Sequence, residues 1–376
     1  MSINHSPLGG PMDRRGFLWR SAVGVLGLSL ARCTTHAVTP LVPGVALPFL
    51  TPTGEHYTKN GAEGSLAGWS MPNLAADAWS LDIGGLVSEP LTLTLDHLRA
   101  EESRAVEIVK TMQCVVDASA GQGLVGTARW RGVPLSIFLD RAGIDRSRSK
   151  RVHLFGADGF TNNLRLDRIF GLDPAHGVVE PLLVPHMTGQ PLTREHGAPV
   201  RLIVHDGFGY TAVKWLVGIE ATADDSAFGT YQETGFTDAN RSPVFSRVTT
   251  PTDNLTVPAG AVEITGFATS GVEGIEAVEV RVDGGPWQPA TLADREAVLR
   301  SHPELAGTLQ FAAPERFVWP YRAVWALWSF TWQATPGRHR IEVRAIDRTG
   351  ATQPERDSDI SDGVNAVAAI RVGVNG

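Results

Sequence analysis

Cysteine is scarce in this chain: its 376 residues include only two, Cys33 and Cys114. Cys33 lies in an N-terminal stretch that we expect to be removed, so the mature protein would keep Cys114 alone. A single cysteine excludes an intrachain disulfide and a conventional cysteine-rich zinc site. A solitary cysteine is most often an inert core residue, so a role for Cys114 has to be argued from the segments around it.

Other absences exclude further classes of protein. The 11 histidines include no His-x-x-x-His pair, which argues against a zinc enzyme, and without a Cys-x-x-Cys-His sequence we expect no attached c-type haem. The net charge is −7 and neither sign forms long runs, so the chain has no basic patch for nucleic acid. A protein of this size can bury a large core and needs no disulfides, even in an oxidising compartment.

The N-terminal residues have the pattern of an export signal. The pair Arg14-Arg15 precedes an apolar stretch, residues 21–31, which is shorter than the about 20 residues needed to span a bilayer. A charged start, a short apolar middle and a small residue, Ala37, at the end are typical of a signal peptide, and the arginine pair indicates the twin-arginine route. We therefore predict a signal over residues 1–37 and a periplasmic or exported protein. Lipid anchoring at Cys33 is an alternative, which the arginine directly before it disfavours.

The rest of the chain changes its pattern near residue 250. Before that point, apolar runs alternate with short helical patterns and with loops rich in Gly and Pro. Apolar residues recur at i, i+3, i+4 and i+7 over residues 135–142 behind a proline, which predicts a short amphipathic helix. Residues 200–204 and 213–217 have the composition of buried strands. We predict a mixed α/β domain over residues 45–248, with its loops converging on one site.

After residue 250 the pattern alternates every two residues. Apolar side chains alternate over residues 278–282, 328–332 and 341–345, and turn residues follow each run. Regular short strands of this kind predict an immunoglobulin-like β-sandwich over residues 250–376, so the fold class is α+β. The alternation breaks over residues 293–320, which we interpret as an insertion whose first part is helical or looped.

Five segments, taken in order, resemble the sulfite oxidase family of molybdenum enzymes, and together they cover nearly all of the mature chain. Their order makes the resemblance more specific than any one segment alone. The segments are Thr111-Met112-Gln113-Cys114; Thr127-Ala128-Arg129-Trp130 with Gly132-Val133-Pro134-Leu135; Ala157-Asp158-Gly159-Phe160-Thr161; Glu195-His196-Gly197-Ala198-Pro199-Val200-Arg201 with Val213-Lys214-Trp215-Leu216; and Val282-Asp283-Gly284-Gly285-Pro286-Trp287 with Gln353-Pro354. The resemblance implies a molybdopterin-binding domain over residues 45–248 and a molybdenum-cofactor dimerisation domain over residues 250–376.

The resemblance also implies one Mo-molybdopterin per chain, with Cys114 as the protein ligand of the molybdenum. Soft sulfur donors suit a metal that changes oxidation state. The pterin phosphate needs cations, and Arg201 and Lys214 match the family positions that supply them. A lysine in an apolar segment, as Lys214 is, is rarely buried without an anion nearby. The other cofactor contacts carried over from the family are Asn60, Asp158, Thr161 and His196.

The departures from the family concern the substrate. Arginines that gather a dianionic substrate in the family are replaced here: Asp117 lies after the ligand cysteine, Lys59 stands in the N-terminal segment, and Phe267 opens the sandwich. Phe236 stands where the family has an active-site tyrosine. We count Cys114, Lys59, Asp117 and Phe236 as the candidate catalytic residues. Since each charge-assisted hydrogen bond from arginine contributes about 1.5–3 kcal/mol, these losses would weaken sulfite binding by orders of magnitude, and Asp117 would repel a dianion.

The sequence thus predicts an exported molybdenum oxidoreductase that transfers an oxygen atom or two electrons, on a neutral or weakly charged substrate such as a sulfur compound. An S-oxide or N-oxide reductase on the same scaffold remains open, as does a binding or scaffold protein that has lost catalysis. The chain has no haem or flavin motif, so we expect a separate electron-transfer protein such as a c-type cytochrome. The resemblance implies a homodimer formed through the C-terminal domain.

Overall fold

The computed structural model describes residues 47–60, 63, 69–117, 123–172, 177–238, 241–359 and 361–376. The predicted signal over residues 1–37 and Cys33 lie outside the described residues, so the export prediction stays a prediction. Within the described ranges, no helix is both long enough and apolar enough to cross a membrane.

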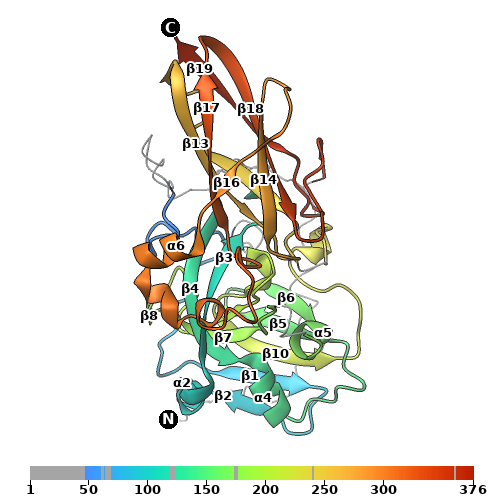
Figure 1. The fold of residues 1–376 in the computed structure, drawn as a ribbon. Helices are drawn as coiled ribbons and strands as arrows, with labels where there is room; N and C mark the ends of the chain where they lie inside the picture. Colours follow the sequence, from blue (N-terminus) through green and yellow to red (C-terminus); the bar gives the residue numbers. More distant parts are fainter. Residues whose placement is uncertain are drawn as a thin grey trace. The chain divides into compact units, whose positions relative to one another are not determined.

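The N-terminal domain contains two β-sheets (Figure 1). The first has five strands in the order β2-β1-β10-β5-β6, in which β1 and β10 pair in parallel and the other neighbours are antiparallel. Its strands are β1 (Leu81–Gly85), β2 (Leu91–Leu93), β5 (Arg151–Gly156), β6 (Thr161–Arg165) and β10 (Leu216–Thr222). Because β10 lies between β1 and β5, the residues that follow β10 lie next to strands from early in the sequence.

The second sheet follows the order β3-β4-β7-β8, with β9 also paired to β7, and every pairing in it is antiparallel. Its strands are β3 (Val106–Gln113), β4 (Val125–Pro134), β7 (Leu182–Met187), β8 (Gln190–Pro191) and β9 (Arg201–Ile203). Cys114 directly follows the last residue of β3, so the sheet places it in the β3–β4 connection.

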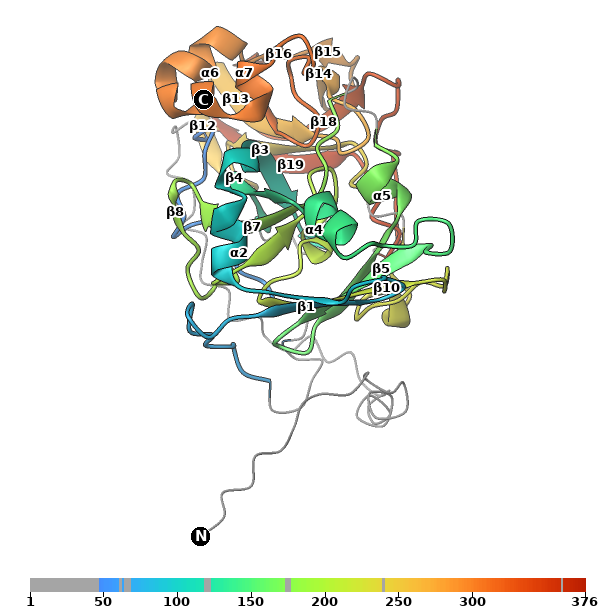
Figure 2. The same cartoon turned by 90° about the horizontal axis from the view of Figure 1, so that it is seen from below.

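Short helices lie around these sheets, as Figure 2 shows for α2, α4 and α5. They are α2 (Leu95–Ala100), α4 (Leu135–Arg141) and α5 (Asp167–Phe170), with 3-10 turns η1 (Glu102–Arg104), η3 (Gly209–Thr211) and η4 (Gln232–Thr234). The predicted helix behind Pro134 is confirmed as α4, and its side chains Leu135, Phe138 and Leu139 are fully buried. Burying such side chains contributes about 1.5–3 kcal/mol each to the free energy of folding, so the burial of its apolar face holds this helix in place.

One predicted strand is partly wrong. Residues 200–204 contain β9, as expected, but the strand predicted over residues 213–217 begins only at Leu216. Trp215 has a positive φ of 47°, and its indole N–H donates to the carbonyl oxygen of Arg194 at 3.0 Å. Tertiary contacts therefore bend the chain at Lys214 and Trp215, where local composition favours a strand.

The C-terminal domain is the predicted β-sandwich. One sheet has the order β11-β13-β17-β16 and the other β12-β19-β18-β14-β15. The predicted alternating runs lie in β14, β17 and β18. The strands are β11 (Phe245–Thr250), β12 (Thr256–Pro258), β13 (Gly260–Thr269), β14 (Ile275–Val282), β15 (Gln288–Pro289), β16 (Thr291–Leu292), β17 (Ala326–Ala334), β18 (Gly337–Asp347) and β19 (Ala368–Asn375). Because β11 pairs with β13, the chain enters the sandwich at Phe245, earlier than the change of pattern near residue 250.

The predicted insertion contains α6 (Arg295–Ser301), η5 (Pro303–Gly307) and α7 (Leu309–Ala312). It packs against the N-terminal domain through Gln310, whose side chain is fully buried. The Gln310 amide accepts from the backbone N–H of Val109 on β3 at 3.0 Å and donates to the Val109 carbonyl at 2.7 Å. Two residues further along β3, the N–H of Thr111 donates to the carbonyl of Ala323 at 2.8 Å. The insertion and the segment after it thus cover the outer edge of β3.

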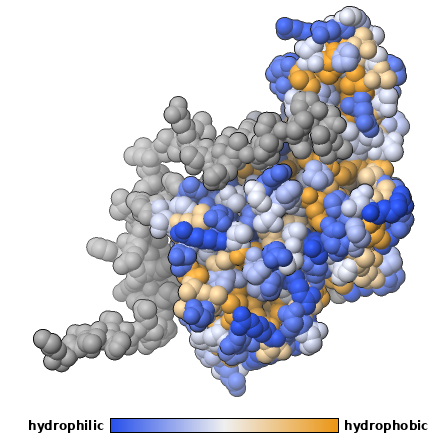
Figure 3. Space-filling model, turned by 90° about the vertical axis from the view of Figure 1, so that its left-hand side faces the viewer, coloured by the Kyte–Doolittle hydropathy of each residue, from blue (hydrophilic) through white to orange (hydrophobic). Residues whose placement is uncertain are grey.

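The molecular surface is mixed in character. On the face in Figure 3, apolar patches lie among hydrophilic residues. Among the described residues, the one large apolar side chain that is well exposed is Val318, at 64%. A single valine does not define a binding face, so surface hydropathy alone does not locate a dimer interface.

Candidate functional site

A cavity lies beside Cys114, with about 560 Å³ of empty space, part of which is open to solvent. Its walls come from segments far apart in the sequence: the stretch before β1, the ends of β3 and β5, and the chain between β9 and β10. Six of the residues predicted from the sequence line it: Lys59, Asn60, Cys114, Asp158, Arg201 and Lys214. The prediction of one converging site therefore agrees with the fold.

Cys114 is held in place by its backbone. Its N–H donates to the carbonyl of Leu124 at 2.9 Å, and its own carbonyl accepts from the N–H of Asp117 at 3.0 Å. Only 7% of the residue is exposed, and it forms part of the cavity wall. A thiol fixed at a cavity wall in this way is suited to ligating a soft metal.

Arg201 is a buried cation on β9, with 2% of its surface exposed. Its guanidinium donates to the carbonyls of His196 at 3.0 Å and Ala212 at 2.9 Å. Its Nε has no hydrogen-bond partner, and no carboxylate of the described residues forms an ion pair with it. Burial lowers the pKa of Arg201 to about 10.

Lys214 lies next to it on the cavity wall. Its ammonium donates to Asn60 Oδ1 at 2.8 Å and to the carbonyls of Glu195 at 2.7 Å and Thr58 at 3.3 Å. These acceptors are neutral, and burial lowers the pKa of Lys214 well below its usual value. Gly197, at a φ of 97°, makes this approach possible, because a Cβ there would lie 2.8 Å from the Cβ of Lys214.

Arg201, which is buried, and Lys214, which is half-buried, indicate an anion-binding cavity. A buried charge is costly unless it is paired, and the hydrogen bonds described for Arg201 and Lys214 go to neutral groups. The unsatisfied Nε of Arg201 leaves one further donor available. Arg201 could bind two oxygens of a phosphate with its planar guanidinium. Lys214 could bind the same phosphate through the single charge of its ammonium group.

Two histidines lie beside this cluster. His196 Nε2 is 3.0 Å from the carbonyl of Thr53, and its Nδ1 has no hydrogen-bond partner among the described residues. His56 packs edge-on against His196, with ring centroids 5.5 Å apart. Burial lowers the pKa of His196 to about 4 and that of His56 to about 3. Both imidazoles are therefore neutral at pH 7. His196 does not line the cavity itself, but its carbonyl orients Arg201.

These pKa values predict acid sensitivity in the cofactor-free protein. An unfolded histidine takes up a proton near pH 6.5, whereas His56 and His196 stay neutral in the fold until about pH 3 and 4. The unfolded state therefore gains protons first, and the free energy of unfolding should fall by about 2 kcal/mol per histidine between pH 6.5 and 5. Urea unfolding at pH 7.5 and 5.0 measures it. Burial also lowers the pKa of His205 well below its usual value, so three histidines contribute. The variant His56→Gln should therefore lose about a third of the pH dependence, and an unchanged pH dependence in that variant would contradict the prediction.

Asp158 lies in the turn between β5 and β6, and Thr161 is the first residue of β6. Asp158 lines the cavity, its Oδ1 accepts from the N–H of Phe160 at 3.1 Å, and burial raises its pKa. Thr161 is absent from the cavity wall. Its N–H donates to Thr230 Oγ1 at 3.0 Å, so it holds the segment that follows β10.

Asp117 and Phe236, predicted as catalytic residues, also lie outside the cavity lining. Asp117 is fully buried and forms an ion pair with Arg247 of β11 at 2.9 Å. Burial raises the pKa of Asp117, while Arg247 opposes the shift. Phe236 packs edge-on against Tyr231, which does line the cavity. Neither Asp117 nor Phe236 is therefore placed to touch a molecule bound in this cavity.

Several aromatic cavity residues were missed from the sequence. Tyr57, Phe160, Tyr210, Trp215 and Tyr231 line the cavity. Burial raises the pKa of Tyr57 well above its usual value, so its hydroxyl keeps its proton and can donate a hydrogen bond. Most of these residues lie in loops or short turns, where no periodic pattern marks them. The available signals were neighbours in the sequence: Phe160 and Trp215 lie in segments that resemble the family, and Tyr57 lies shortly before Lys59 and Asn60.

Comparisons with known proteins identify the class. Residues 68–229 match the family model described as the oxidoreductase molybdopterin binding domain, and residues 238–374 match the Mo-co oxidoreductase dimerisation domain. Mitochondrial sulfite oxidase from Rattus norvegicus is 29% identical over 345 residues, covering 82% of this chain and 58% of that protein. An NADH nitrate reductase from Solanum lycopersicum is 27% identical over 363 residues, covering 82% of this chain. The chain spans 36% of that nitrate reductase.

The fold is also similar to a solved structure. The sulfane dehydrogenase SoxCD from Paracoccus pantotrophus superposes with a TM-score of 0.68 at 18% identity, covering 98% of this chain and 92% of that one. With both family models matched in order, the chain belongs to the sulfite oxidase family of molybdopterin oxidoreductases. Membership implies Mo-molybdopterin, and the residues present fit it: the buried thiol of Cys114, the buried Arg201 and the half-buried Lys214 all line the cavity.

Proposed function

We propose that this protein is a molybdenum-cofactor oxidoreductase that transfers an oxygen atom or two electrons. The observation that carries the proposal is that Cys114, Arg201 and Lys214 line one cavity. Cys114 would ligate the metal, and the two cations would hold the pterin phosphate, with Asn60 orienting Lys214. The bound cofactor would supply the redox chemistry, and the protein supplies placement and electrostatics.

The substrate that we propose is a neutral or weakly charged compound, such as a sulfur compound. Arg201 is the one arginine among the described residues of the cavity wall, and two backbone carbonyls already engage it. Aromatic residues form much of the remaining wall. Since Asp117 is paired with Arg247, the argument against a dianion rests on the missing arginines.

The direction of reaction has a second candidate. Nitrate reductases are among the relatives, which favours a reductive reaction on an oxide as the alternative to oxidation.

We further propose export by the twin-arginine route, electron exchange with a separate protein such as a c-type cytochrome, and a homodimer. The matched dimerisation domain supports the homodimer.

The test is cofactor content followed by turnover. Protein purified from a host that makes the cofactor should contain about one molybdenum and one pterin per chain, by elemental analysis and by fluorescence of the oxidised pterin. Steady-state assays should then give much lower kcat/KM for sulfite than for an uncharged sulfur substrate. A micromolar KM for sulfite would contradict the substrate proposal. Folded protein without molybdenum would contradict the enzyme proposal and favour a scaffold.

A further inference from the structure

The segment that follows β10 forms one wall of the cavity through Tyr231. Tyr231 packs against Phe160, Tyr210 and Phe236, with ring centroids 6.0, 5.5 and 5.1 Å apart. Residues 225–238 contain no β-strand, and their one helical element is η4, a single 3-10 turn. The N–H of Thr230 donates to the carbonyl of Thr161 on β6 at 3.0 Å. The position of Tyr231 therefore depends on this bond and on the side-chain contacts that hold the segment against the first sheet.

Arg151 of β5 holds both ends of the segment. Its Nε donates to Asp225 Oδ1 at 3.0 Å, and its Nη1 forms an ion pair with Asp238 Oδ2. Only 6% of the Arg151 side chain is exposed, but 25% of Asp238 and 53% of Asp225 are, so water screens the pair with Asp238 less than the pair with Asp225. One buried guanidinium thus binds two carboxylates that are separated along the chain by the whole segment.

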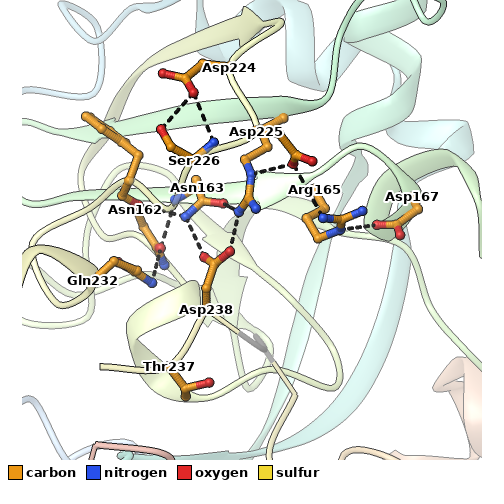
Figure 4. Close-up of polar contacts among 12 residues, drawn as sticks. Asn162, Asn163, Arg165, Asp167, Asp224, Asp225, Ser226, Gln232, Thr237 and Asp238 are labelled. Carbon is orange, nitrogen blue, oxygen red and sulfur yellow. Dashed lines mark hydrogen bonds and ion pairs between the residues drawn. The ribbon is translucent and has the colours of Figure 1, made fainter. Parts of the chain in front are cut away.

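Two fully buried asparagines of β6 hold the middle of the segment. Asn163 accepts from Arg151 at 2.7 Å and donates to the carbonyl of Phe228 at 2.7 Å and to Asp238 at 3.0 Å. Asn162 accepts from Gln232, the neighbour of Tyr231, at 3.1 Å. Figure 4 shows Asn162, Asn163, Gln232, Asp225 and Asp238 in one connected set of polar contacts.

The same network reaches a second cavity residue. The Asn162 amide donates to the carbonyl of Tyr210 at 2.7 Å, and the Tyr210 hydroxyl donates to the carbonyl of Thr237 at 3.0 Å. Tyr210 and Tyr231 both line the cavity. The network behind the wall therefore fixes two of its aromatic side chains relative to each other.

We infer that Arg151 is a positioning residue, which holds residues 225–238 closed against the cavity and so sets where Tyr231 and Tyr210 meet the substrate. It does not line the cavity and acts through the two carboxylates and the asparagines. A guanidinium suits this role because it can bind several acceptors at once, whereas a lysine ammonium is a point charge. The role in catalysis rests on the proposed function; the role in holding the segment does not.

The chain offers a matched control in Arg165. This arginine on neighbouring β6 also contacts Asp225, at 3.4 Å, and Asp167, at 3.5 Å, but 46% of its side chain is exposed. Arg165→Gln removes the same charge from the same region without touching Asp238. Exposed ion pairs contribute little, so this variant should behave like the unchanged protein.

The experiment compares Arg151→Gln, Arg151→Lys and Arg165→Gln in the holoenzyme by hydrogen exchange and kinetics. Exchange of amides in residues 225–238 should rise about tenfold or more in Arg151→Gln, less in Arg151→Lys, and not in Arg165→Gln, with β1 and β10 unchanged. The kcat/KM should fall roughly 10- to 100-fold in Arg151→Gln because misplaced binding groups are costly, with the molybdenum content unchanged and partial recovery in Arg151→Lys.

Two results would overturn the inference. One is exchange in residues 225–238 that is the same in Arg151→Gln as in the unchanged protein. The other is increased exchange with unaltered kcat and KM, which would reduce Arg151 to a structural residue. If the unchanged protein lacks molybdenum, the proposed function fails, and the exchange comparison still decides whether Arg151 holds the segment.

Discussion

Cys114→Ser should remove turnover while leaving the protein folded. Residues that merely support a metal ligand change affinity or activity by about 10–100-fold, so loss of the ligand itself should cost at least about 100-fold. The substitution is small, and its cost in stability should be about 1–2 kcal/mol because one polar group enters a site that is 7% exposed. Molybdenum content, the sulfur-to-metal absorption band and kcat, measured together, test this prediction.

A control on β3, the strand that leads to Cys114, separates packing from ligation. Ile108 of β3 is fully buried and lies away from the cavity wall. Ile108→Val should cost about 0.5–1.5 kcal/mol of stability and leave the molybdenum content unchanged. Full turnover and an unaltered absorption band in Cys114→Ser would make Cys114 an inert core residue after all.

Asp117→Ala should give the largest loss of stability. Asp117 is fully buried, accepts from the N–H of Leu124 at 2.5 Å and pairs with Arg247 at 2.9 Å. Its removal leaves the 20% exposed Arg247 without this partner and the N–H of Leu124 without this acceptor. Since a hydrogen bond to a charged group contributes about 1.5–3 kcal/mol, the loss should be about 3 kcal/mol. Urea unfolding at pH 7.5 measures it. Arg247→Ala should cost less, because burial already raises the pKa of Asp117 and the carboxyl can take up a proton.

The double variant Asp117→Ala with Arg247→Ala completes the cycle. We expect a coupling energy of at least about 1 kcal/mol, and additive losses would mean that the pair is not coupled. Asp117→Asn tests the role first inferred from the sequence. If Asp117 repels a dianion at the metal, this variant should lower the KM for sulfite about tenfold. If Arg247 already neutralises the charge, the KM should stay the same.

The sequence supported the fold wherever a periodic pattern dictated burial. The helix over residues 135–142 and the strands around Val280, Trp328 and Val343 follow directly from the spacing of their apolar residues. The strand predicted over residues 213–217 was partly wrong because Trp215 is fixed by Arg194, a contact that no local pattern reveals. The boundary between the domains also depends on a pairing, β11 with β13, that lies outside any local window.

The candidate site also contains residues that the sequence could predict and residues that it could not. Cys114, Arg201 and Lys214 could be predicted because the segments around them resemble a family, and a lysine within an apolar segment already suggests a nearby anion. Tyr210 and Tyr231 could not, since they reach the cavity through tertiary contacts. Asp117 could be noticed, but the arginine that pairs with it lies in another domain. The sequence shows that a charged residue is present at such a position, but it does not show which residue pairs with it in the fold.

The amide of Gln310 has a consequence for how chains of this protein behave toward one another. β3 is the outermost strand of its sheet, and unpaired outer strands are templates on which other chains can add strands and aggregate. The side-chain amide of Gln310 gives Val109 the hydrogen-bond donor and acceptor that a neighbouring strand would supply. The carbonyl of Ala323 supplies the acceptor for the N–H of Thr111. One side chain thus stands in for a neighbouring strand and ends the sheet. The strand that leads into Cys114 is thereby kept from recruiting a second molecule, and the insertion doubles as protection against misassembly.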